Sequence, residues 1–299
     1  MRVLLLAPTV VPLVTGNAVT VERWRRALVG RGVDVLTLGA AGLEAEDLAA
    51  AVRRFRPDVI HAHHLYRSGS LLLDSRVEAA LGGGHRPLVA SPAGTDLYVD
   101  LTVPERAWVV HAVVDRAAAL VVQGWATAWQ MEALFPGAAA RVVRVPKSFA
   151  WLGSEPFDLR AAAGWGPGHF VFFLPAGVRP VKRNLECLRG LAGVRRARPA
   201  VRAFFAGPVL DPVYGDRFRR EVERRHAFAA WIPSIPPGAM RAAYEGADVV
   251  VNASSAEGLS NALLGAAAAG RPVLASDVPG NREAVLGDGA GTPSGLLFG

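Results

Sequence analysis

The sequence predicts an α/β protein of two domains, each built around a doubly wound parallel sheet. Short apolar runs alternate with longer helical stretches along the whole chain, and this order implies right-handed crossovers between parallel strands. The length of 299 residues corresponds to about two domains at roughly 150 residues each. A stretch rich in Ser, Gly, Pro and Trp interrupts the rhythm near the middle. We therefore expect an N-terminal domain over residues 1–150, a linker over 151–168 and a C-terminal domain over 169–299.

In the first half, six runs of β-branched residues and leucine are continuous rather than alternating. This is typical of strands buried on both faces of a parallel sheet. The runs cover residues 3–7, 33–38, 59–62, 88–91, 120–122 and 142–145. Between the first two, residues 20–30 predict an amphipathic helix, because Val21, Trp24 and Leu28 follow helical spacing and Gly30 ends the pattern.

The second half repeats the same rhythm. Its predicted strands cover residues 170–174, 203–205, 229–232, 249–251, 273–275 and 296–297. Doubly wound sheets bind their ligands at the carboxyl ends of the strands, so the loops that follow these runs are the places to look for a site.

The composition limits the class of protein. A single cysteine, Cys187, allows no disulfide framework and favours a reducing cytoplasm. The net charge of +7 is almost entirely arginine, since Lys147 and Lys182 are the only lysines. This bias is typical of a GC-rich, bacterial genome. The arginines are spread over helix faces without interleaved aromatics, so we expect no nucleic-acid partner, whereas the charge favours phosphates and peripheral contact with acidic lipids.

The apolar start of the chain has two interpretations. An apolar run to residue 14 after Met1 and Arg2 resembles a secretion signal, but Pro8 and Pro12 interrupt it and no A-x-A site closes it. We therefore expect a first buried strand and a loop. No segment reaches the ~18 uninterrupted apolar residues of a membrane span.

The loop over residues 254–261 is the most specific candidate. Small residues here open a helix, and the free N–H groups of a helix start suit a phosphate. Glu257 precedes that helix and could accept hydrogen bonds from sugar hydroxyls, or could simply complement the helix dipole. Arg179 and Lys182 lie between a buried strand and a helix. Both could neutralise a diphosphate, although ordinary loop charge is the alternative.

The N-terminal half carries weaker signals. Gly16 and Asn17 open a helix after the first strand, and Gly16 lets a ligand approach the backbone. No G-x-G-x-x-G motif follows that strand, which disfavours a dinucleotide-dependent oxidoreductase.

Three histidines end the third predicted strand. His61 and His63 share one strand face and His64 lies on the other, but no cysteine or acidic cluster accompanies them, so we expect no metal. His64 and Arg67 lead into the loop and could line the site. Asp96 is either a helix N-cap or a polar group aimed at an acceptor.

Taken together, these motifs resemble the GT-B glycosyltransferases of the large family-4 type, and more narrowly the glycosyltransferase 1 domain-containing protein 1 subgroup. The resemblance rests on eight stretches in the right order, TGNAVT (15–20), HLYR (64–67), GTD (94–96), VRPVK (178–182), GPVLDPVY (207–214), SAEGLSN (255–261), PVLASDVPGN (272–281) and GLLF (295–298). The selenosugar synthases are similar around Gly16 and the GTD stretch.

The resemblance implies two Rossmann-like domains facing across a cleft, and a retaining, metal-independent transfer of sugar from a nucleoside-diphosphate sugar to an unknown small-molecule or glycan acceptor. It implies no cofactor. Arg179, Lys182 and Glu257 take the catalytic positions, the first two on the leaving diphosphate and the third on the donor sugar. Donor-binding positions are Gly16, Asn17, His64, Gly177, Gly258, Leu259, Ser260 and Asn261, and acceptor-side positions are Arg67 and Asp96.

Two departures from the family pattern keep alternatives open. The second glutamate of the family's E-x7-E motif, which binds the nucleotide ribose, is replaced by Gly265. The family also continues beyond residue 299 with one or two helices, so we expect a truncated C-terminal domain. The alternatives are a selenosugar- or thiosugar-forming transferase and a catalytically silent module that binds sugar phosphates.

Overall fold

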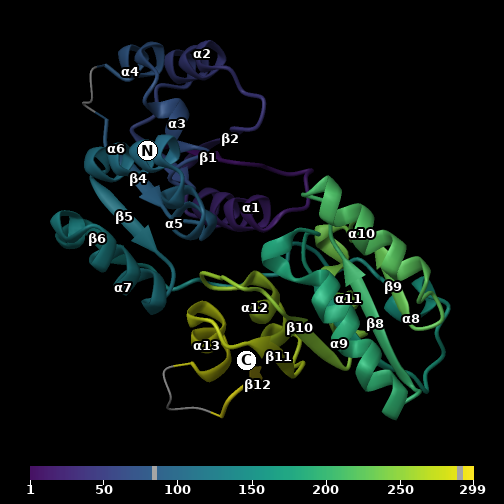
Figure 1. The fold of residues 1–299 in the computed structure, drawn as a ribbon. Coiled ribbons are helices and arrows are strands. Elements are labelled where there is room, and N and C mark those ends of the chain that lie inside the picture. The colour runs from purple at the N-terminus through teal and green to yellow at the C-terminus, as the bar shows by residue number, and fades with distance from the viewer. Residues whose placement is uncertain (83–85, 288–291) are drawn as a thin grey trace. The chain divides into compact units, whose positions relative to one another are not determined.

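A computed structural model describes residues 1–82, 86–287 and 292–299 of the chain. The chain divides into two compact units, which we call the N-terminal unit (Met1–Lys147) and the C-terminal unit (Ser148–Gly299). Each unit contains one six-stranded sheet whose described strand pairs are all parallel, with helices packed against it (Figure 1). This confirms the predicted fold class of two doubly wound α/β domains.

The N-terminal sheet has the order β2-β1-β3-β4-β5-β6. Its strands are β1 (Arg2–Ala7), β2 (Asp34–Gly39), β3 (Val59–His63), β4 (Leu88–Ser91), β5 (Ala119–Val122) and β6 (Val142–Arg144). Its helices are α1 (Gly16–Val29), α2 (Ala45–Phe55), α3 (Gly69–Leu72), α4 (Ser75–Ala80), α5 (Thr95–Tyr98), α6 (Pro104–Arg116) and α7 (Trp125–Leu134), with 3₁₀ turns η1 (Asp100–Thr102) and η2 (Pro136–Arg141). Strand β2 lies on one side of β1 and β3 lies on the other. The order in which strands are added to the sheet therefore reverses between β1 and β3, and this position is the switch point of the sheet.

The C-terminal sheet has the order β12-β11-β10-β7-β8-β9. Its strands are β7 (Phe170–Pro175), β8 (Val201–Ala206), β9 (Ala229–Ile232), β10 (Val249–Asn252), β11 (Val273–Ser276) and β12 (Gly295–Phe298). Its helices are α8 (Leu159–Ala162), α9 (Asn184–Ala197), α10 (Pro212–Glu223), α11 (Met240–Glu245), α12 (Asn261–Ala268) and α13 (Pro279–Leu286), with 3₁₀ turns η3 (Pro180–Lys182) and η4 (Pro237–Ala239). Here the order in which strands are added reverses between β7 and β10, which is the switch point of this sheet.

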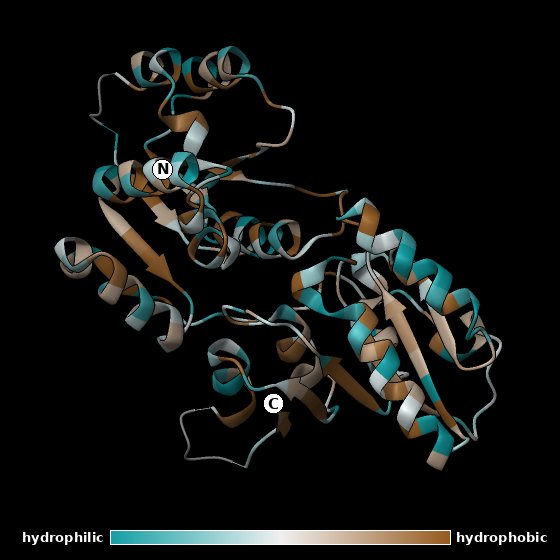
Figure 2. Cartoon of the chain, in the orientation of Figure 1, coloured by the Kyte–Doolittle hydropathy of each residue, from teal (hydrophilic) through white to brown (hydrophobic). Residues whose placement is uncertain are grey.

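Both faces of the C-terminal sheet are buried, as the continuous apolar strands predict. Phe173 and Phe204 pack into one core cluster, while their neighbours Leu174 and Phe205 pack into another. Successive side chains of a strand point to opposite faces, so each strand supplies both clusters. Figure 2 shows this as hydrophobic strands beneath helices whose colours alternate between hydrophilic and hydrophobic.

Helix α1 begins at Gly16, as expected from the stretch after the first strand and ahead of the apolar pattern at residues 20–30. The Thr15 side chain accepts a hydrogen bond from the Ala18 N–H and caps the helix there. The stretch expected to be a linker contributes to the core of the C-terminal unit, where Leu159 and Trp165 are buried. The aromatic residues of this stretch, which interrupted the alternation of strands and helices in the sequence, therefore help to fill that core. Among the described residues, no helix combines the length and apolar character needed to cross a membrane.

Candidate functional site

The best-defined candidate site lies at the switch point of the C-terminal sheet, between β7 and β10. Strands β7 and β10 are hydrogen-bonded neighbours, and the loops that carry Lys182 and Glu257 leave their carboxyl ends. Ligands of doubly wound sheets bind at such a switch point, because the loops of the two strands part to opposite sides and leave an opening. The loops that the sequence singled out separately are therefore adjacent in the fold.

Lys182 and Glu257 form an ion pair between the Lys182 Nζ and the Glu257 Oε1. The two loops are also joined through their backbones, since the Ser255 N–H donates to the Val181 carbonyl over 2.9 Å. Only 18% of the Lys182 side chain and 13% of the Glu257 side chain are exposed. The pair is thus shielded from bulk water, and its charges interact more strongly than charges on the surface do.

Two further residues hold the Glu257 carboxylate in place. The Ser254 hydroxyl donates to Glu257 Oε1 over 2.9 Å, and the Asn252 amide donates to the same oxygen over 3.2 Å. Burial by itself raises the pKa of Glu257, but the Lys182 charge and these hydrogen bonds outweigh it, and the net pKa lies below its usual value. Glu257 is therefore held as a carboxylate, which suits a hydrogen-bond acceptor for hydroxyl groups.

Asn252 and Ser254 did not figure among the sequence-predicted site residues. Asn252 is buried, and its amide also donates to the Ser260 hydroxyl over 2.8 Å. The signal was present in the sequence, because a polar residue at the end of an otherwise apolar buried strand needs a polar partner. That partner is the loop that carries Glu257.

Ser260 is the N-cap of α12, which begins at Asn261. Gly258 and Leu259 precede it and are half-buried. The loop is clamped from the other side by α13, since a Cβ atom built on Gly280 would lie 1.3 Å from the Gly258 carbonyl oxygen. The N–H groups at the α12 start thus belong to a loop fixed by backbone packing, which is the pre-organisation that anion binding requires.

Arg179 precedes η3 in extended conformation and is half-buried. Its backbone N–H donates to the Asn184 side chain over 3.4 Å, and that amide in turn donates to the Ala176 carbonyl over 3.4 Å. At Gly177, a Cβ atom would lie 2.6 Å from the Leu210 side chain. This loop therefore packs closely against the loop that follows β8.

Gly265 lies on the buried side of α12. A Cβ atom at this position would lie 2.6 Å from the ring of Tyr244, which is itself buried against Phe173. The tyrosine ring therefore occupies the space into which a side chain at residue 265 would extend. A glutamate at residue 265 would therefore have to displace this ring.

In the N-terminal unit, the predicted residues also gather at the switch point of the sheet. Gly16 and Asn17 begin α1 after β1, and His64 follows β3, the neighbour of β1. Gly16 is exposed and Asn17 is half-buried.

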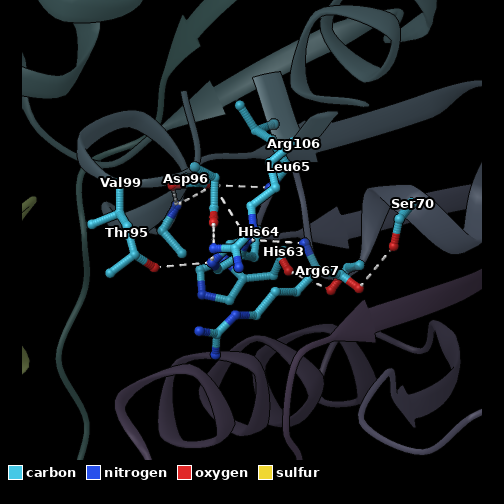
Figure 3. Close-up of polar contacts among 12 residues, drawn as sticks. His63, His64, Leu65, Arg67, Ser70, Thr95, Asp96, Val99 and Arg106 are labelled. Atoms are coloured by element: carbon cyan, nitrogen blue, oxygen red, sulfur yellow. Dashed lines mark hydrogen bonds and ion pairs between the residues drawn. The ribbon is translucent and has the colours of Figure 1, made fainter. Parts of the chain in front are cut away.

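His64 is fully buried and has a φ of 82°, in the left-handed region that residues other than glycine rarely adopt. Its Nδ1 accepts from the Arg67 N–H over 3.2 Å, which leaves the proton of a neutral ring on Nε2, 3.0 Å from the Thr95 hydroxyl (Figure 3). The Arg67 side chain is exposed. His64 thus orders the β3 loop, and its predicted contact with a donor stays a prediction.

Asp96 is fully buried and joins two loops. Its carboxylate accepts from the Leu65 N–H over 2.8 Å and from the Ala93 N–H over 3.0 Å (Figure 3). The N-cap of α5 is Gly94, and no side chain caps that helix. Asp96 therefore holds the β3 and β4 loops together instead of capping a helix, and its assignment to the acceptor side stays a prediction.

The other two histidines pack on Trp24, which confirms that they share a strand face. His61 stacks on the indole at 4.7 Å and His63 meets it edge-on at 5.0 Å. Burial lowers the pKa of His61 to about 4 and holds the pKa of His63 well below its usual value. Among the residues that the structure describes, no group of three or more His, Cys, Asp or Glu side chains is arranged to hold a metal ion.

The sequence of the C-terminal unit matches a known family. Residues 170–298 match the model described as "Glycosyl transferases group 1". Over 290 residues, the chain is 27% identical to glycosyltransferase 1 domain-containing protein 1 of Xenopus tropicalis, a match that covers 95% of this chain and 80% of that protein.

Solved structures share the fold of the whole chain. Anabaena HepE in complex with UDP-glucose matches with a TM-score of 0.73 at 18% identity, over 100% of this chain and 85% of that one. Sucrose-phosphate synthase of Thermosynechococcus elongatus matches with a TM-score of 0.76 at 17% identity, over 99% and 85%. The catalytic domain of starch synthase IV of Arabidopsis thaliana, bound to ADP and acarbose, matches with a TM-score of 0.75 at 11% identity, over 99% and 88%. Residues 170–298 therefore match the glycosyl transferases group 1 model, and the two parallel-sheet units of the chain have the GT-B fold of these structures.

Proposed function

We propose that this protein transfers a sugar from a nucleoside-diphosphate sugar to an acceptor hydroxyl, with retention of the anomeric configuration and without a metal ion. The observation that carries the proposal is the half-buried Lys182–Glu257 pair at the switch point of the C-terminal sheet. The pair places a cation and a carboxylate side by side, next to the start of α12. A diphosphate and a sugar joined to it require that combination.

In the proposed reaction, the bond between the anomeric carbon and the diphosphate breaks, and its electron pair leaves with the diphosphate. Lys182 has three donors and only one of them is needed for Glu257, so the others can bind the diphosphate oxygens. Arg179 and Lys182 stabilise the negative charge as it grows, which is the role that a metal ion takes in other transferases. The acceptor oxygen then bonds to the anomeric carbon, and its proton passes to the departing diphosphate.

Glu257 binds the donor sugar in this proposal. Its pKa lies below the usual value, so it accepts hydrogen bonds from sugar hydroxyls at neutral pH. The Ser254 and Asn252 hydrogen bonds fix its position, and the carboxylate need not reorganise when the donor arrives. The comparisons support a nucleotide-sugar donor, since the related folds include structures named for their complexes with UDP-glucose and with ADP.

One observation favours a second candidate, a silent module that binds sugar phosphates. Tyr244 occupies the space next to Gly265, where the family pattern has its ribose-binding glutamate. A site without that contact binds the nucleotide through the diphosphate and the sugar alone. Binding without turnover would identify this candidate.

The test is release of nucleotide from UDP-, GDP- and ADP-glucose, with the binding of each followed by calorimetry. We expect one donor to be turned over, and Lys182→Ala to lower that turnover by about 100-fold or more. Arg241→Ala is the matched control, because Arg241 lies on the surface of the same unit in an exposed pair with Glu245. Turnover that survives Lys182→Ala unchanged would refute the proposed site, and binding of a donor without release by the unmodified chain would favour the silent module.

A further inference from the structure

The positive charge of the chain is concentrated in one segment. Residues 179–226 contain 13 of the 33 lysines and arginines but only five of the 26 acidic residues. The rest of the chain has 20 basic and 21 acidic residues and is close to neutral. The segment comprises α9, β8 and α10 with their loops. Charge gathered in this way raises the local concentration of anions at one place on the surface.

A hollow of about 420 Å³ lies between α9 and α10, which pack side by side (Figure 1). It is lined by Leu185, Arg189, Arg217, Arg220, Glu221, Glu223 and Arg224. Four lining residues lie on α10, and Arg224 is the C-cap of that helix. Arg217, Arg220, Glu221 and Arg224 follow the i, i+3, i+4, i+7 spacing of a single helix face. That face carries three arginines toward α9.

Most of this positive charge has no partner within the protein. Glu221 pairs with Arg224 and, over 2.8 Å, with Arg225. Among the described residues, the side chains of Arg189, Arg217 and Arg220 make no hydrogen bond or ion pair. Like charges at these spacings repel each other, so a protein gains nothing in stability from such an arrangement.

The hollow is held at a constant width near its end. The Tyr214 hydroxyl, at the start of α10, donates to the Glu186 carboxylate over 2.7 Å. The same hydroxyl oxygen accepts from the Leu185 N–H over 2.8 Å. These bonds tie the first turn of α10 to the first turn of α9. The two helices that line the hollow are therefore held together without a ligand, which reduces the entropy cost of binding.

We propose that the hollow between α9 and α10 is a binding site for a phosphate group, separate from the Lys182–Glu257 site. Guanidinium groups are planar forks that match two phosphate oxygens each, and three unpaired forks suit an anion of more than one charge. Among the described residues, no aromatic side chain lines the hollow, so it offers no aromatic platform for a nucleobase. The phosphate belongs either to a soluble ligand or to the headgroup of an acidic lipid.

The test measures binding of pyrophosphate by calorimetry to the full-length chain carrying Lys182→Ala, which impairs the proposed donor site and isolates the second one. We expect binding that weakens with added salt. In the Arg217→Gln/Arg220→Gln variant, we expect it to be at least about tenfold weaker, because two charge-assisted contacts are lost. The control is Arg196→Gln/Arg198→Gln, which removes the same charge from exposed positions outside the hollow.

Sedimentation with vesicles distinguishes the two sources of phosphate. Equal parts of phosphatidylglycerol and phosphatidylcholine are compared with phosphatidylcholine alone. Binding to the acidic vesicles that is lost with Arg217 and Arg220 identifies a lipid headgroup, whereas pyrophosphate binding without vesicle binding identifies a soluble phosphate. Absence of both, or an equal loss in the Arg196 and Arg198 control, would overturn the proposal. Turnover of a sugar donor is not needed for either measurement, so this result is independent of the proposed function.

Discussion

Replacing Lys182 by methionine should show how strongly the half-buried ion pair with Glu257 holds the two loops of the C-terminal unit together. Unit charges 4 Å apart attract by about 4 kcal/mol at the effective dielectric of about 20 that describes most protein sites. The side chains are 18% and 13% exposed, so water screens part of this attraction. We expect a coupling free energy between Lys182 and Glu257 of about 2 kcal/mol at pH 7.

The pH dependence follows from the pKa of Glu257. In the folded protein this pKa lies below its usual value of 4.5, so its stabilising effect is fully present above about pH 4.5 and is lost as the pH falls through the lowered value. In Lys182→Met the burial of the carboxyl remains without the opposing charge. Glu257 then destabilises the fold at neutral pH, and protonation at low pH relieves that penalty. The coupling should therefore be larger at pH 7 than at pH 4, and should vanish only below the lowered pKa of Glu257.

The assay is a double-mutant cycle of Lys182→Met, Glu257→Gln and the two combined, with unfolding followed by calorimetry at both pH values. The transition that shifts in Glu257→Gln belongs to the C-terminal unit. The exposed pair of Arg241 and Glu245, whose atoms lie 2.9 Å apart, is the matched control and should give about 0.5 kcal/mol or less. A coupling for Lys182 and Glu257 no larger than that of the control pair, at pH 7, would refute the view that this pair is a shielded one.

Three further predictions concern close packing and buried histidine. Gly280→Ala should destabilise the C-terminal unit by about 3 kcal/mol or more in urea unfolding, because its Cβ would lie 1.3 Å from the Gly258 oxygen, and an unchanged midpoint would contradict that contact. Gly265→Ala should cost about 1–3 kcal/mol, since its Cβ meets the Tyr244 ring, and the double variant with Tyr244→Phe should not recover it, because the ring carbons remain. The pKa of His61 is about 4 and that of His63 is also lowered, so the N-terminal unit should lose stability as the pH falls from 6.5 to 4, with up to about 3 kcal/mol from His61. His61→Gln should reduce this loss in calorimetry, and an equal slope in the variant would assign the loss to other groups.

Much of the fold follows from the sequence, because strands buried on both faces are unmistakably apolar. Runs such as residues 170–174 are recognisable without any knowledge of their partners, and the order of strands and helices implies parallel sheets. The loops that carry Lys182 and Glu257 were predicted for the same reason. Each directly follows such a strand, and ligands bind at that edge.

What the sequence did not reveal is which groups meet once the loops have folded. Asn252, at the end of a buried strand, indicated that a polar partner was needed, but its bonds to Glu257 and Ser260 exist only once the loop has folded back. The burial of His64 and Asp96 likewise arises where the loops after β3 and β4 meet. The core packing of Leu159 and Trp165 within the expected linker was not predicted, because aromatic and glycine residues mark both loops and irregular core segments, and only the folded structure separates the two.

The seam between β7 and β10 has a consequence for how the site comes into being. Lys182 and Glu257 are 75 residues apart along the chain, and they belong to the two halves of the sheet, β7-β8-β9 and β10-β11-β12, which join only at that seam. Neither half contains a site by itself, so the site forms only when the chain has closed this long loop, at the entropy cost that loop closure carries. A ligand that touches both residues binds only the closed form. By mass action such a ligand stabilises the form in which β7 and β10 are paired. A higher ligand concentration therefore lowers the fraction of molecules in which the two halves of the sheet are separated.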